Sequence, residues 1–274
     1  MQIAAIQMVS GAGLQDNLQA AAGLLAQAAE RGAELALLPE YFCLMGQRDA
    51  DKLAIQESFG AGPIQDFLAA QAQALGLWIV GGTLPISTPQ PDKVYNSSLV
   101  FDPAGTCVAR YDKIHLFRFD NGREAYDESQ VLVPGTQAVA FDLPSIDGHR
   151  WRVGLSVCYD LRFAELYRAY AAQGADLVLV PSAFTYTTGQ AHWELLMRAR
   201  AVENLCFVAA AGQGGLHGNG RRTWGQSLVV DPWGAVLAQQ AQEPGVVMAA
   251  MDAERLAAVR SQLPALQHRV LSGR

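Results

Sequence analysis

Three side chains of types used in nucleophilic catalysis each stand at the end of an expected strand. Cys158 follows the apolar run WRVGLSV, Glu40 follows LALLP, and Lys113 follows CVARYD. A thiol can attack an electrophilic carbon, a carboxylate can take the thiol proton, and an ammonium can stabilise the resulting oxyanion. Ligands of α/β sheets bind beyond strand ends, so the three residues are compatible with covalent catalysis by a nucleophile if the fold brings them together.

The residues after Cys158, in CYDLRFAEL, favour the start of a helix. Asp160, Arg162 and Glu165 could pair around its first turn, while main-chain N–H groups face the thiol. Such an environment would lower the thiol pKa and make the thiolate more available. Taken alone, this cysteine is equally compatible with packing and with function.

The other cysteines carry weaker signals. No C-x-x-C pair occurs, so neither a zinc knuckle nor a disulfide framework is indicated, and reduced thiols are expected. Cys107 and Cys206 lie in apolar runs typical of buried packing, whereas the role of Cys43 stays open.

Two pairs of similar segments indicate an internal duplication. GAELALLPEYF, from Gly32, matches GADLVLVPSAF, from Gly174, and each predicts a helix end, a turn and a buried strand. SSLVFDPAGTCVA, from Ser97, matches QSLVVDPWGAVLA, from Gln226, and Asp-Pro-x-Gly in each predicts a hairpin with a type I turn. Helices are expected at 14–30, 63–75, 162–173 and 190–204.

Each copy therefore reads strand, helix, strand, helix, strand, hairpin, with a connection near 114–150 between them. Parallel strands need helices on a face, and the hairpins add antiparallel strands. We expect an α/β fold, a four-layer α-β-β-α sandwich of two mixed sheets. No low-complexity stretch or hinge-like linker separates the copies, so residues 1–274 are predicted to form one domain.

The duplication also serves as an internal control for Glu40. The second copy has Ser182 at the matching position, so the turn does not require an acid there. Lys113 is flanked by Ile114, Leu116 and Phe117, which would keep an ammonium away from bulk water. A solvated role remains the simpler alternative for an isolated Glu or Lys at a strand end.

Composition limits the classes of partner. The formal charge is −6 and no run of Lys or Arg occurs, which argues against non-specific binding to nucleic acid or anionic membrane. The first residues, MQIAAIQM, lack the cationic start of a signal peptide, and no uncharged apolar run approaches membrane-spanning length. A soluble, cytoplasmic protein is expected.

The motifs LLPEYF, YDKIHLF and VCYDLRF resemble, in order, those of the Glu-Lys-Cys triad in the nitrilase, or carbon–nitrogen hydrolase, superfamily. The resemblance runs through PSAFTYTTGQAHWELLMRARAVEN and WGQSLVVDPWG to QLPALQHR. Within the superfamily the sequence is most similar to the branch of ω-amidases and deaminated-glutathione amidases. The resemblance implies the same four-layer sandwich, a homodimer or higher homo-oligomer, a small amide substrate, and catalysis without a metal or cofactor.

The resemblance implies the following roles. Glu40 is the general base, Cys158 the nucleophile, and Lys113 with the backbone N–H of Tyr159 stabilises the oxyanion. YDESQVLVPG places a second, supporting glutamate at Glu128, while the nearby Glu124 does not match. The thiol is expected near hydrogen-bond reach of both Glu40 and Lys113.

Pocket residues follow from the same resemblance. Arg162, Phe184 and Thr188 match positions that line the pocket and hold the carboxylate of a 2-oxo acid. A structural ion pair of Arg162 with Glu165 or Glu203 is the alternative. A Cys-His dyad, with a base from His115 or His192, is the competing mechanism. Trp193, beside His192, is expected to open a helix.

The loop AGQGGLHGNGRRTWG bears on the substrate. It enters a strand rather than a helix, which excludes a nucleotide-binding fingerprint. We expect a mobile rim, and its Arg221 and Arg222 could meet a second carboxylate, as deaminated glutathione would supply; ordinary solvated arginines are the alternative. An ω-amidase acting on 2-oxoglutaramate or 2-oxosuccinamate is the alternative, then a nitrilase or another aliphatic amidase. A non-catalytic binding or scaffolding protein is the remaining hypothesis.

Overall fold

Two mixed β-sheets form the centre of the molecule. The structure, a computed structural model, describes residues 1–271. Strands of the first sheet are β1 (Gln2–Gln7), β2 (Leu35–Leu37), β3 (Trp78–Val80), β4 (Leu84–Ser87), β5 (Val94–Phe101), β6 (Cys107–Asp112) and β17 (Gly245–Ala250). They run in the order β17-β1-β2-β3-β5-β4, and β6 pairs with β5.

The second sheet repeats this plan with the second copy of the sequence. Its strands are β9 (Ala140–Pro144), β10 (Arg150–Leu155), β11 (Leu177–Leu179), β12 (Phe207–Ala210), β15 (Leu228–Val230) and β16 (Val236–Gln239). The order is β16-β15-β12-β11-β10-β9. In each sheet three parallel strands are followed by an antiparallel hairpin, as the duplication predicts.

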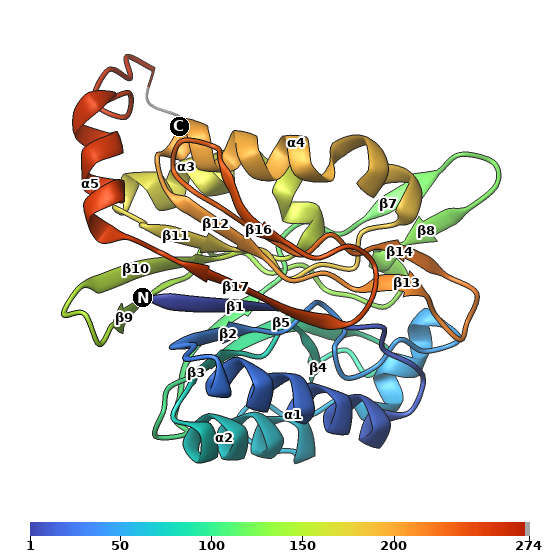
Figure 1. Cartoon of the computed structure of the whole chain (residues 1–274). Helices are drawn as coiled ribbons and strands as arrows, with labels where there is room; N and C mark the ends of the chain where they lie inside the picture. The colour runs from blue at the N-terminus through green and yellow to red at the C-terminus, as the bar shows by residue number, and fades with distance from the viewer. Residues whose placement is uncertain (272–274) are drawn as a thin grey trace.

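Helices cover the outer face of each sheet (Figure 1). α1 (Leu14–Glu30) and α2 (Pro63–Leu75) pack on the first sheet, and α3 (Ala164–Ala172) and α4 (Tyr186–Asn204) pack on the second. α5 (Ala253–Gln262) follows β17, which returns from the C-terminal part of the chain to pair with β1. The predicted four-layer α-β-β-α sandwich is confirmed.

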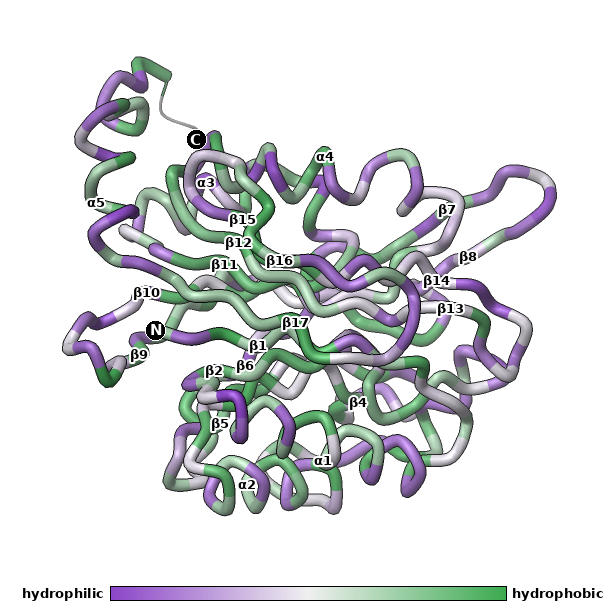
Figure 2. Tube along the Cα trace, in the orientation of Figure 1, coloured by the Kyte–Doolittle hydropathy of each residue, from purple (hydrophilic) through white to green (hydrophobic). Residues whose placement is uncertain are grey.

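Alternation along the strands explains the layers. In β1, Ile3 and Ala5 belong to the core cluster shared with the second sheet, whereas Ala4 and Ile6 belong to the cluster beneath α1 and α2. Successive strand residues point to opposite faces, so a run that is apolar throughout is buried on both sides. Figure 2 shows the result, with mostly hydrophobic strands at the centre and mixed helices outside.

The predicted turns and two of the helices agree with the structure. The Asp-Pro-x-Gly turns close with hydrogen bonds of 2.8 Å from Gly105 N to Asp102 O and 2.9 Å from Gly234 N to Asp231 O. Both glycines have positive φ, 80° and 88°, a region that a side chain would disfavour. The bounds of α1 and α2 match the predicted ones.

The other two helices differ at their starts. A short 3₁₀ helix, η3 (Cys158–Arg162), precedes α3, and the extended backbone of Phe163 separates the two. α4 begins four residues before the predicted Gln190, capped by the Thr185 side chain, which accepts from Thr188 N. The sequence did not predict this first turn because it contains Gly189, and glycine disfavours helix. The structure requires glycine there, because a Cβ at this position would lie 2.3 Å from Trp224. His192 and Trp193 therefore lie inside α4 and do not open it.

Shorter elements lie at one end of the sandwich, on the right in Figure 1. They are two hairpins and two 3₁₀ helices, namely β7 (Arg118–Asp120), β8 (Ala125–Asp127), β13 (Gly214–Leu216), β14 (Arg222–Trp224), η1 (Asp49–Ile55) and η2 (Glu128–Gln130). Within residues 1–271, no helix is long and apolar enough to cross a membrane.

Candidate active site

Glu40 is buried at the carboxyl end of β2, with 1% of its surface exposed. Its Oε1 atom accepts hydrogen bonds of 2.9 Å from both Asn96 Nδ2 and Lys113 Nζ. Its Oε2 atom accepts a 2.9 Å hydrogen bond from the backbone N–H of Ala183, in the second copy. The carboxylate is thus held in one orientation by three donors from three segments of the chain.

Lys113 follows β6 directly and is also 1% exposed. Its ammonium lies between two carboxylates, 2.9 Å from Glu40 Oε1 and 2.8 Å from Glu128 Oε2. Burial lowers the pKa of Lys113, but the charges of Glu128 and Glu40 outweigh burial and raise that pKa above its usual value. The lysine is therefore a fixed cation, and its burial is compensated by ion pairing.

Glu128, at the start of η2, is the second carboxylate of the site. Besides Lys113, it accepts hydrogen bonds of 2.9 Å from Tyr41 Oη and 2.7 Å from Phe117 N. Burial would raise the pKa of Glu128, but the ammonium of Lys113 holds it below its usual value. Glu128 directly follows the hairpin β7–β8, which thus places an ionised carboxylate beside Lys113.

Cys158 stands where β10 ends and η3 begins. Its φ of 50° is unusual for a residue with a side chain and turns the backbone sharply, and its N–H donates to Pro181 O at 3.0 Å. Such a conformation costs on the order of 1–2 kcal/mol and persists where the surrounding structure enforces it. Although 8% exposed, the thiol lines a pocket.

The predicted lowering of the Cys158 pKa is wrong. Burial, followed by the negative charge of Glu40, raises the thiol pKa well above its usual value. The prediction considered the local backbone amides but not the burial of the thiol or the negative charge of Glu40, which the resemblance already places near it. The resting group is therefore a thiol, and it needs a base at the moment of attack. The side chain of Glu40 raises the pKa of this thiol and the ammonium of Lys113 lowers it, so both predicted partners act on the sulfur.

Asp160 forms a second buried network behind the thiol. Its carboxylate accepts hydrogen bonds from Val157 N at 2.8 Å, Tyr111 Oη at 2.7 Å and His115 N at 3.0 Å, and lies 2.7 Å from His115 Nδ1. The expected pairing of Asp160 around the first helical turn is therefore wrong. The residue instead joins the segment that carries Lys113 to the one that carries Cys158.

The two histidines considered as alternative bases do not line the pocket. His115 is held by Asp160 and stacks on Phe163 with ring centroids 3.6 Å apart. His192 lies in α4, with its Nδ1 atom 3.2 Å from Arg162 Nη1. The geometry thus favours Glu40 over a Cys-His dyad.

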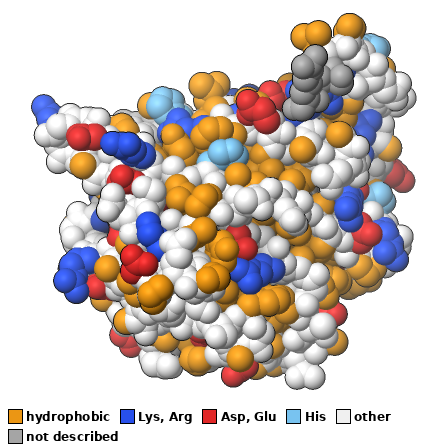
Figure 3. All heavy atoms as spheres, turned by 180° about the vertical axis from the view of Figure 1, so that it is seen from behind, with side chains coloured by type: hydrophobic (Ala, Val, Ile, Leu, Met, Phe, Trp, Pro, Cys, Tyr) orange, Lys and Arg blue, Asp and Glu red, His pale blue; other side chains and the backbone are white. Residues whose placement is uncertain are grey.

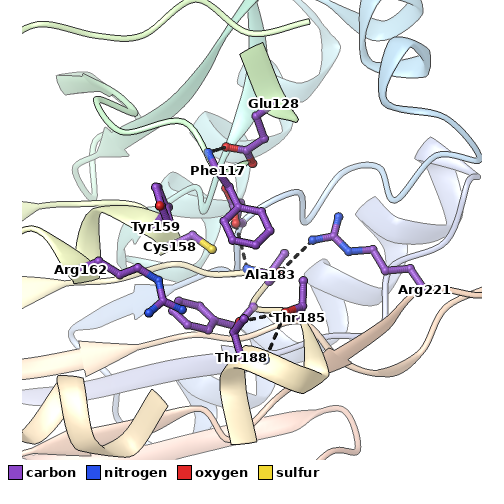
Figure 4. A pocket seen from close by; sticks show the side chains of 11 residues that line it. Phe117, Glu128, Cys158, Tyr159, Arg162, Ala183, Thr185, Thr188 and Arg221 are labelled. Carbon is purple, nitrogen blue, oxygen red and sulfur yellow. Dashed lines mark hydrogen bonds between the residues drawn. The ribbon is translucent and has the colours of Figure 1, made fainter. Parts of the chain in front are cut away.

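The pocket contains about 280 Å³ of space, part of it open to solvent (Figure 4). It is lined by Glu40, Phe117, Glu128, Cys158, Tyr159, Arg162, Ala183, Phe184, Thr185, Thr188 and Arg221. Every predicted site residue except Lys113 is in this lining, and Lys113 lies directly behind Glu40 and Glu128. Figure 4 shows Arg162 and Arg221 entering from opposite sides, with Cys158 and Ala183 between them.

Arg162 makes no ion pair among the residues that the structure describes. The alternative of a structural pair is therefore wrong, since Glu203 pairs with Arg200 at 2.8 Å. The guanidinium instead lies 5.5 Å from the ring of Phe184 and 5.8 Å from that of Tyr159. A cation without an acid partner, at the wall of a pocket, is suited to bind an anionic group.

The two arginines of the glycine-rich loop lie in different environments. Arg221 lines the pocket, whereas Arg222 stacks on Tyr186, with its guanidinium 3.6 Å from the ring centroid, and does not. Hydrogen bonds of His217 to Ser10 O and Thr223 Oγ1 fasten the loop, which forms the hairpin β13–β14. These contacts hold in place the segment expected to be a mobile rim.

Sequence reasoning missed Asn96 and Tyr41, which donate to the two carboxylates. A signal for Asn96 was available, because the second copy has Gly225 at the matching position. Cys43 is buried beside the helices, and burial raises the pKa of its thiol to about 12, so it packs as an apolar residue. Glu124 is half-buried and accepts from Tyr126 Oη and Thr187 Oγ1.

No group of three or more His, Cys, Asp or Glu side chains in residues 1–271 is arranged to hold a metal ion.

Comparison with known proteins decides the family. The family model described as carbon–nitrogen hydrolase matches residues 2–261. The chain belongs to the carbon–nitrogen hydrolase family. Its predicted membership, its fold and its class as a hydrolase of carbon–nitrogen bonds are thereby confirmed.

Relatives of this carbon–nitrogen hydrolase share about two fifths of its residues. It is 40% identical to a deaminated glutathione amidase of Yersinia enterocolitica, over 97% of this chain and 92% of that protein. It is 38% identical to the human ω-amidase NIT2, over 98% and 94%. The solved structure of an amidase from Nesterenkonia sp. AN1, with acrylamide added at its active-site cysteine, matches with a TM-score of 0.78 and 32% identity, over 96% and 98%.

Proposed function

We propose that this carbon–nitrogen hydrolase is an amidase that cleaves the terminal amide of a small 2-oxo acid amide, with deaminated glutathione as the first candidate. The observation that carries the proposal is the convergence of Glu40, Lys113 and Glu128 beside the thiol of Cys158. The names of the two relatives support an amide substrate. We assign the reaction to one domain spanning residues 1–274.

In the acylation half-reaction, Glu40 takes the thiol proton while the Sγ atom of Cys158 bonds to the amide carbon. The carbonyl π electrons move to oxygen, where Lys113 and the backbone N–H of Tyr159 stabilise the negative charge. Glu40 then gives the proton to the amide nitrogen as the C–N bond breaks. Ammonia or an amine departs, and a thioester remains on Cys158.

In the second half-reaction, Glu40 takes a proton from water, and the resulting hydroxide attacks the thioester carbon. The C–S bond breaks, the sulfur regains its proton from Glu40, and the product leaves as a carboxylic acid that loses its proton to solvent to give the carboxylate. The raised pKa of Cys158 suits this cycle, because a base must act at each attack and the thiol returns to its neutral form. Glu128 positions Lys113 and the substrate.

We assign the carboxylate of the 2-oxo acid to Arg162, with Phe184 and Thr188 completing that wall. Arg162 lacks an acid partner among residues 1–271, and all three side chains line the pocket. A planar guanidinium binds a carboxylate through two parallel hydrogen bonds. The assigned wall would select 2-oxo acid amides over uncharged amides.

The second candidate is an ω-amidase acting on 2-oxoglutaramate or 2-oxosuccinamate, supported by the similarity to human ω-amidase NIT2. Deaminated glutathione is glutathione with its amino group replaced by an oxo group, so its cleavage releases 2-oxoglutarate and cysteinylglycine. 2-Oxoglutaramate gives 2-oxoglutarate and ammonia. A nitrilase would instead hydrolyse a C≡N group, and turnover of nitriles would favour that class.

The test is the formation of 2-oxoglutarate by the purified protein from deaminated glutathione and, in parallel, from 2-oxoglutaramate, with Cys158→Ala as the blank. A higher kcat/KM for deaminated glutathione supports the first candidate, and the reverse supports the ω-amidase. No turnover of either amide would refute the proposed function.

The cellular setting belongs to the same proposal. All four cysteines are free thiols, which suits the reducing cytoplasm. Lys and Arg side chains are scattered over the face in Figure 3, so we assign no nucleic-acid partner.

We further assign a homodimer or larger homo-oligomer. Three large apolar side chains gather at a shallow depression on α4 and the β15–β16 turn, namely Leu195, Val202 and Trp233 with exposures of 68%, 45% and 54%. Light scattering after size-exclusion chromatography should give at least two chains for the wild type. A monomer would remove this assignment.

A further inference from the structure

A second cavity adjoins the candidate active site. It lies between the segment 44–52, which includes the start of η1, and the hairpins β7–β8 and β13–β14. Its space of about 770 Å³ is more than twice the 280 Å³ of the first pocket by the same measure. Arg221 lines both cavities, and Tyr41 lies between Glu128 and the second one. The two spaces are therefore neighbours across a shared wall.

Arg221 is the cation of that wall. Its Nη2 atom donates to Ala183 O at 3.0 Å, and Ala183 N in turn holds Glu40. Its Nε atom is buried without a partner in residues 1–271, and in the same part of the chain the guanidinium makes no ion pair. A buried donor without an acceptor is costly, so a bound acceptor would be favoured there.

With Arg221 included, the lining of the second cavity is cationic on balance, although Arg48 also pairs with Asp51 at 3.5 Å. Three basic residues and one acid line it, namely Arg48, Lys52, Arg221 and Asp49. The acid is already neutralised, because Asp49 Oδ1 accepts from Lys52 Nζ at 2.7 Å. An anionic group entering this cavity would thus meet Arg221 without a competing carboxylate from Asp49.

The wall is also rigidly built. Asn219 Nδ2 donates to Gly46 O at 2.6 Å, which joins the two rims of the cavity. Asn219 Oδ1 accepts from Arg221 N at 2.9 Å, which fixes the backbone that carries the guanidinium. A binding group held in advance loses less freedom when its ligand arrives.

We propose that the second cavity binds the leaving group of the amide, and that Arg221 recognises a carboxylate on that leaving group. The inference rests on the proposed function, which assigns the acyl carboxylate to Arg162. Arg162 and Arg221 lie on opposite sides of Cys158 (Figure 4), so the two ends of an extended amide would reach one arginine each. The ligand class is a small amine or dipeptide with a terminal carboxylate.

The neighbouring arginine provides a matched control. Arg222 is exposed, stacks on Tyr186 and lines neither cavity. Arg221→Gln and Arg222→Gln remove the same charge one residue apart, so a general effect of net charge would appear in both.

The experiment compares deaminated glutathione with its terminal carboxamide, in which the distal charge is removed, and with 2-oxoglutaramate. In the wild type, kcat/KM should be about 10- to 100-fold higher for the carboxylate than for the carboxamide, as expected for a charge-assisted hydrogen bond. Arg221→Gln should bring this ratio close to one, mainly by raising KM. Arg222→Gln should keep it within about twofold of the wild type.

Two results would overturn the inference. One is a wild-type enzyme that turns over both substrates equally well, a result that requires no variant. The other is an unchanged ratio in Arg221→Gln. If the wild type cleaves 2-oxoglutaramate but ignores the distal charge, only this inference fails. If it cleaves none of the three amides, the proposed function fails as well.

Discussion

The two copies of the repeated unit have the same framework of strands and helices but different side chains at their strand ends. Glu40 follows β2, whereas Ser182 follows β11 at the matching position. Lys113 follows the first hairpin, and Gln242 takes its place after the second. Each reactive side chain of the first copy thus has an unreactive counterpart in the second.

The nucleophile reverses this relation. Ile3 pairs with Leu35 in the first sheet as Val153 pairs with Leu177 in the second. Counting five residues onward from each gives Met8 in the first copy and Cys158 in the second. The base and the cation therefore come from one copy and the thiol from the other.

The copies also depend on each other. The backbone N–H of Ala183, next to Ser182, donates to Glu40, so the turn of the second copy orients the carboxylate of the first. The comparison teaches that the repeated residues specify the strands and turns, whereas the differing residues at the strand ends specify the reaction.

The largest effect is expected from Glu40→Gln, which keeps the shape of the side chain but removes the base. General-base catalysis contributes about 10²- to 10⁴-fold, so kcat should fall by that range. The matched change in the other copy, Ser182→Ala, should alter kcat by less than about threefold. Comparable losses in both variants would show that the two turns are not functionally distinct.

Lys113→Met should follow, with a loss of about 10²- to 10³-fold in kcat, because an oxyanion donor is removed. It would also leave Glu40 and Glu128 buried without their cation, so thermal denaturation should show a marked loss of stability. The counterpart Gln242→Met should affect neither activity nor stability. Activity retained in Lys113→Met would exclude the oxyanion role.

Asp160→Asn should have an intermediate effect, because Asp160 joins the Lys113 segment to the Cys158 segment. An amide can accept fewer of the hydrogen bonds that reach the carboxylate, so we expect a roughly 10-fold fall in kcat with little change in KM. If Asp160 served stability alone, Asp160→Asn would lower the melting temperature but leave kcat unchanged at temperatures below that melting point.

The smallest effect is expected for Glu128→Gln, in the segment that connects the two copies, and it concerns the pH dependence of the melting temperature. The pKa of Glu128 is lowered, with Lys113 outweighing burial, so its charge stabilises the fold above its unfolded pKa of about 4.3. That contribution is lost as pH falls through the lower, folded pKa. The wild type should melt roughly 2–4 °C above Glu128→Gln at pH 7, and the gap should close below pH 4.

The control for this measurement is the variant Glu124→Gln. In the wild type, the Glu124 carboxylate accepts hydrogen bonds from the hydroxyls of Tyr126 and Thr187. Its difference from the wild type should change less with pH. A gap for Glu128→Gln that stays constant on acidification would contradict the assigned ion pair.

Much of the framework could be predicted because it rests on local signals. Alternation, turn residues and the internal repeat identified both sheets, both hairpins and the bounds of α1 and α2. The start of α4 could not be predicted, because Gly189 is required by contact with Trp224 and that contact is tertiary.

For the site, sequence identified which residues meet but not how they affect one another. The repeat singled out Glu40 because Ser182 replaces it. The same comparison would have singled out Asn96 against Gly225. The pKa of Cys158 was predicted in the wrong direction because burial, the larger cause, depends on the tertiary fold, and because the charge of Glu40 was not weighed against the local backbone amides.

The central claim, that the thiol of Cys158 carries the reaction, is tested most directly by alkylation with iodoacetamide. Residual activity and the modification of each cysteine would be followed together by peptide mass spectrometry. We predict that activity falls in proportion to the fraction of Cys158 modified, while Cys43, Cys107 and Cys206 do not correlate with it. Full modification of Cys158 with activity retained, or inactivation while Cys158 stays unmodified, would contradict the account.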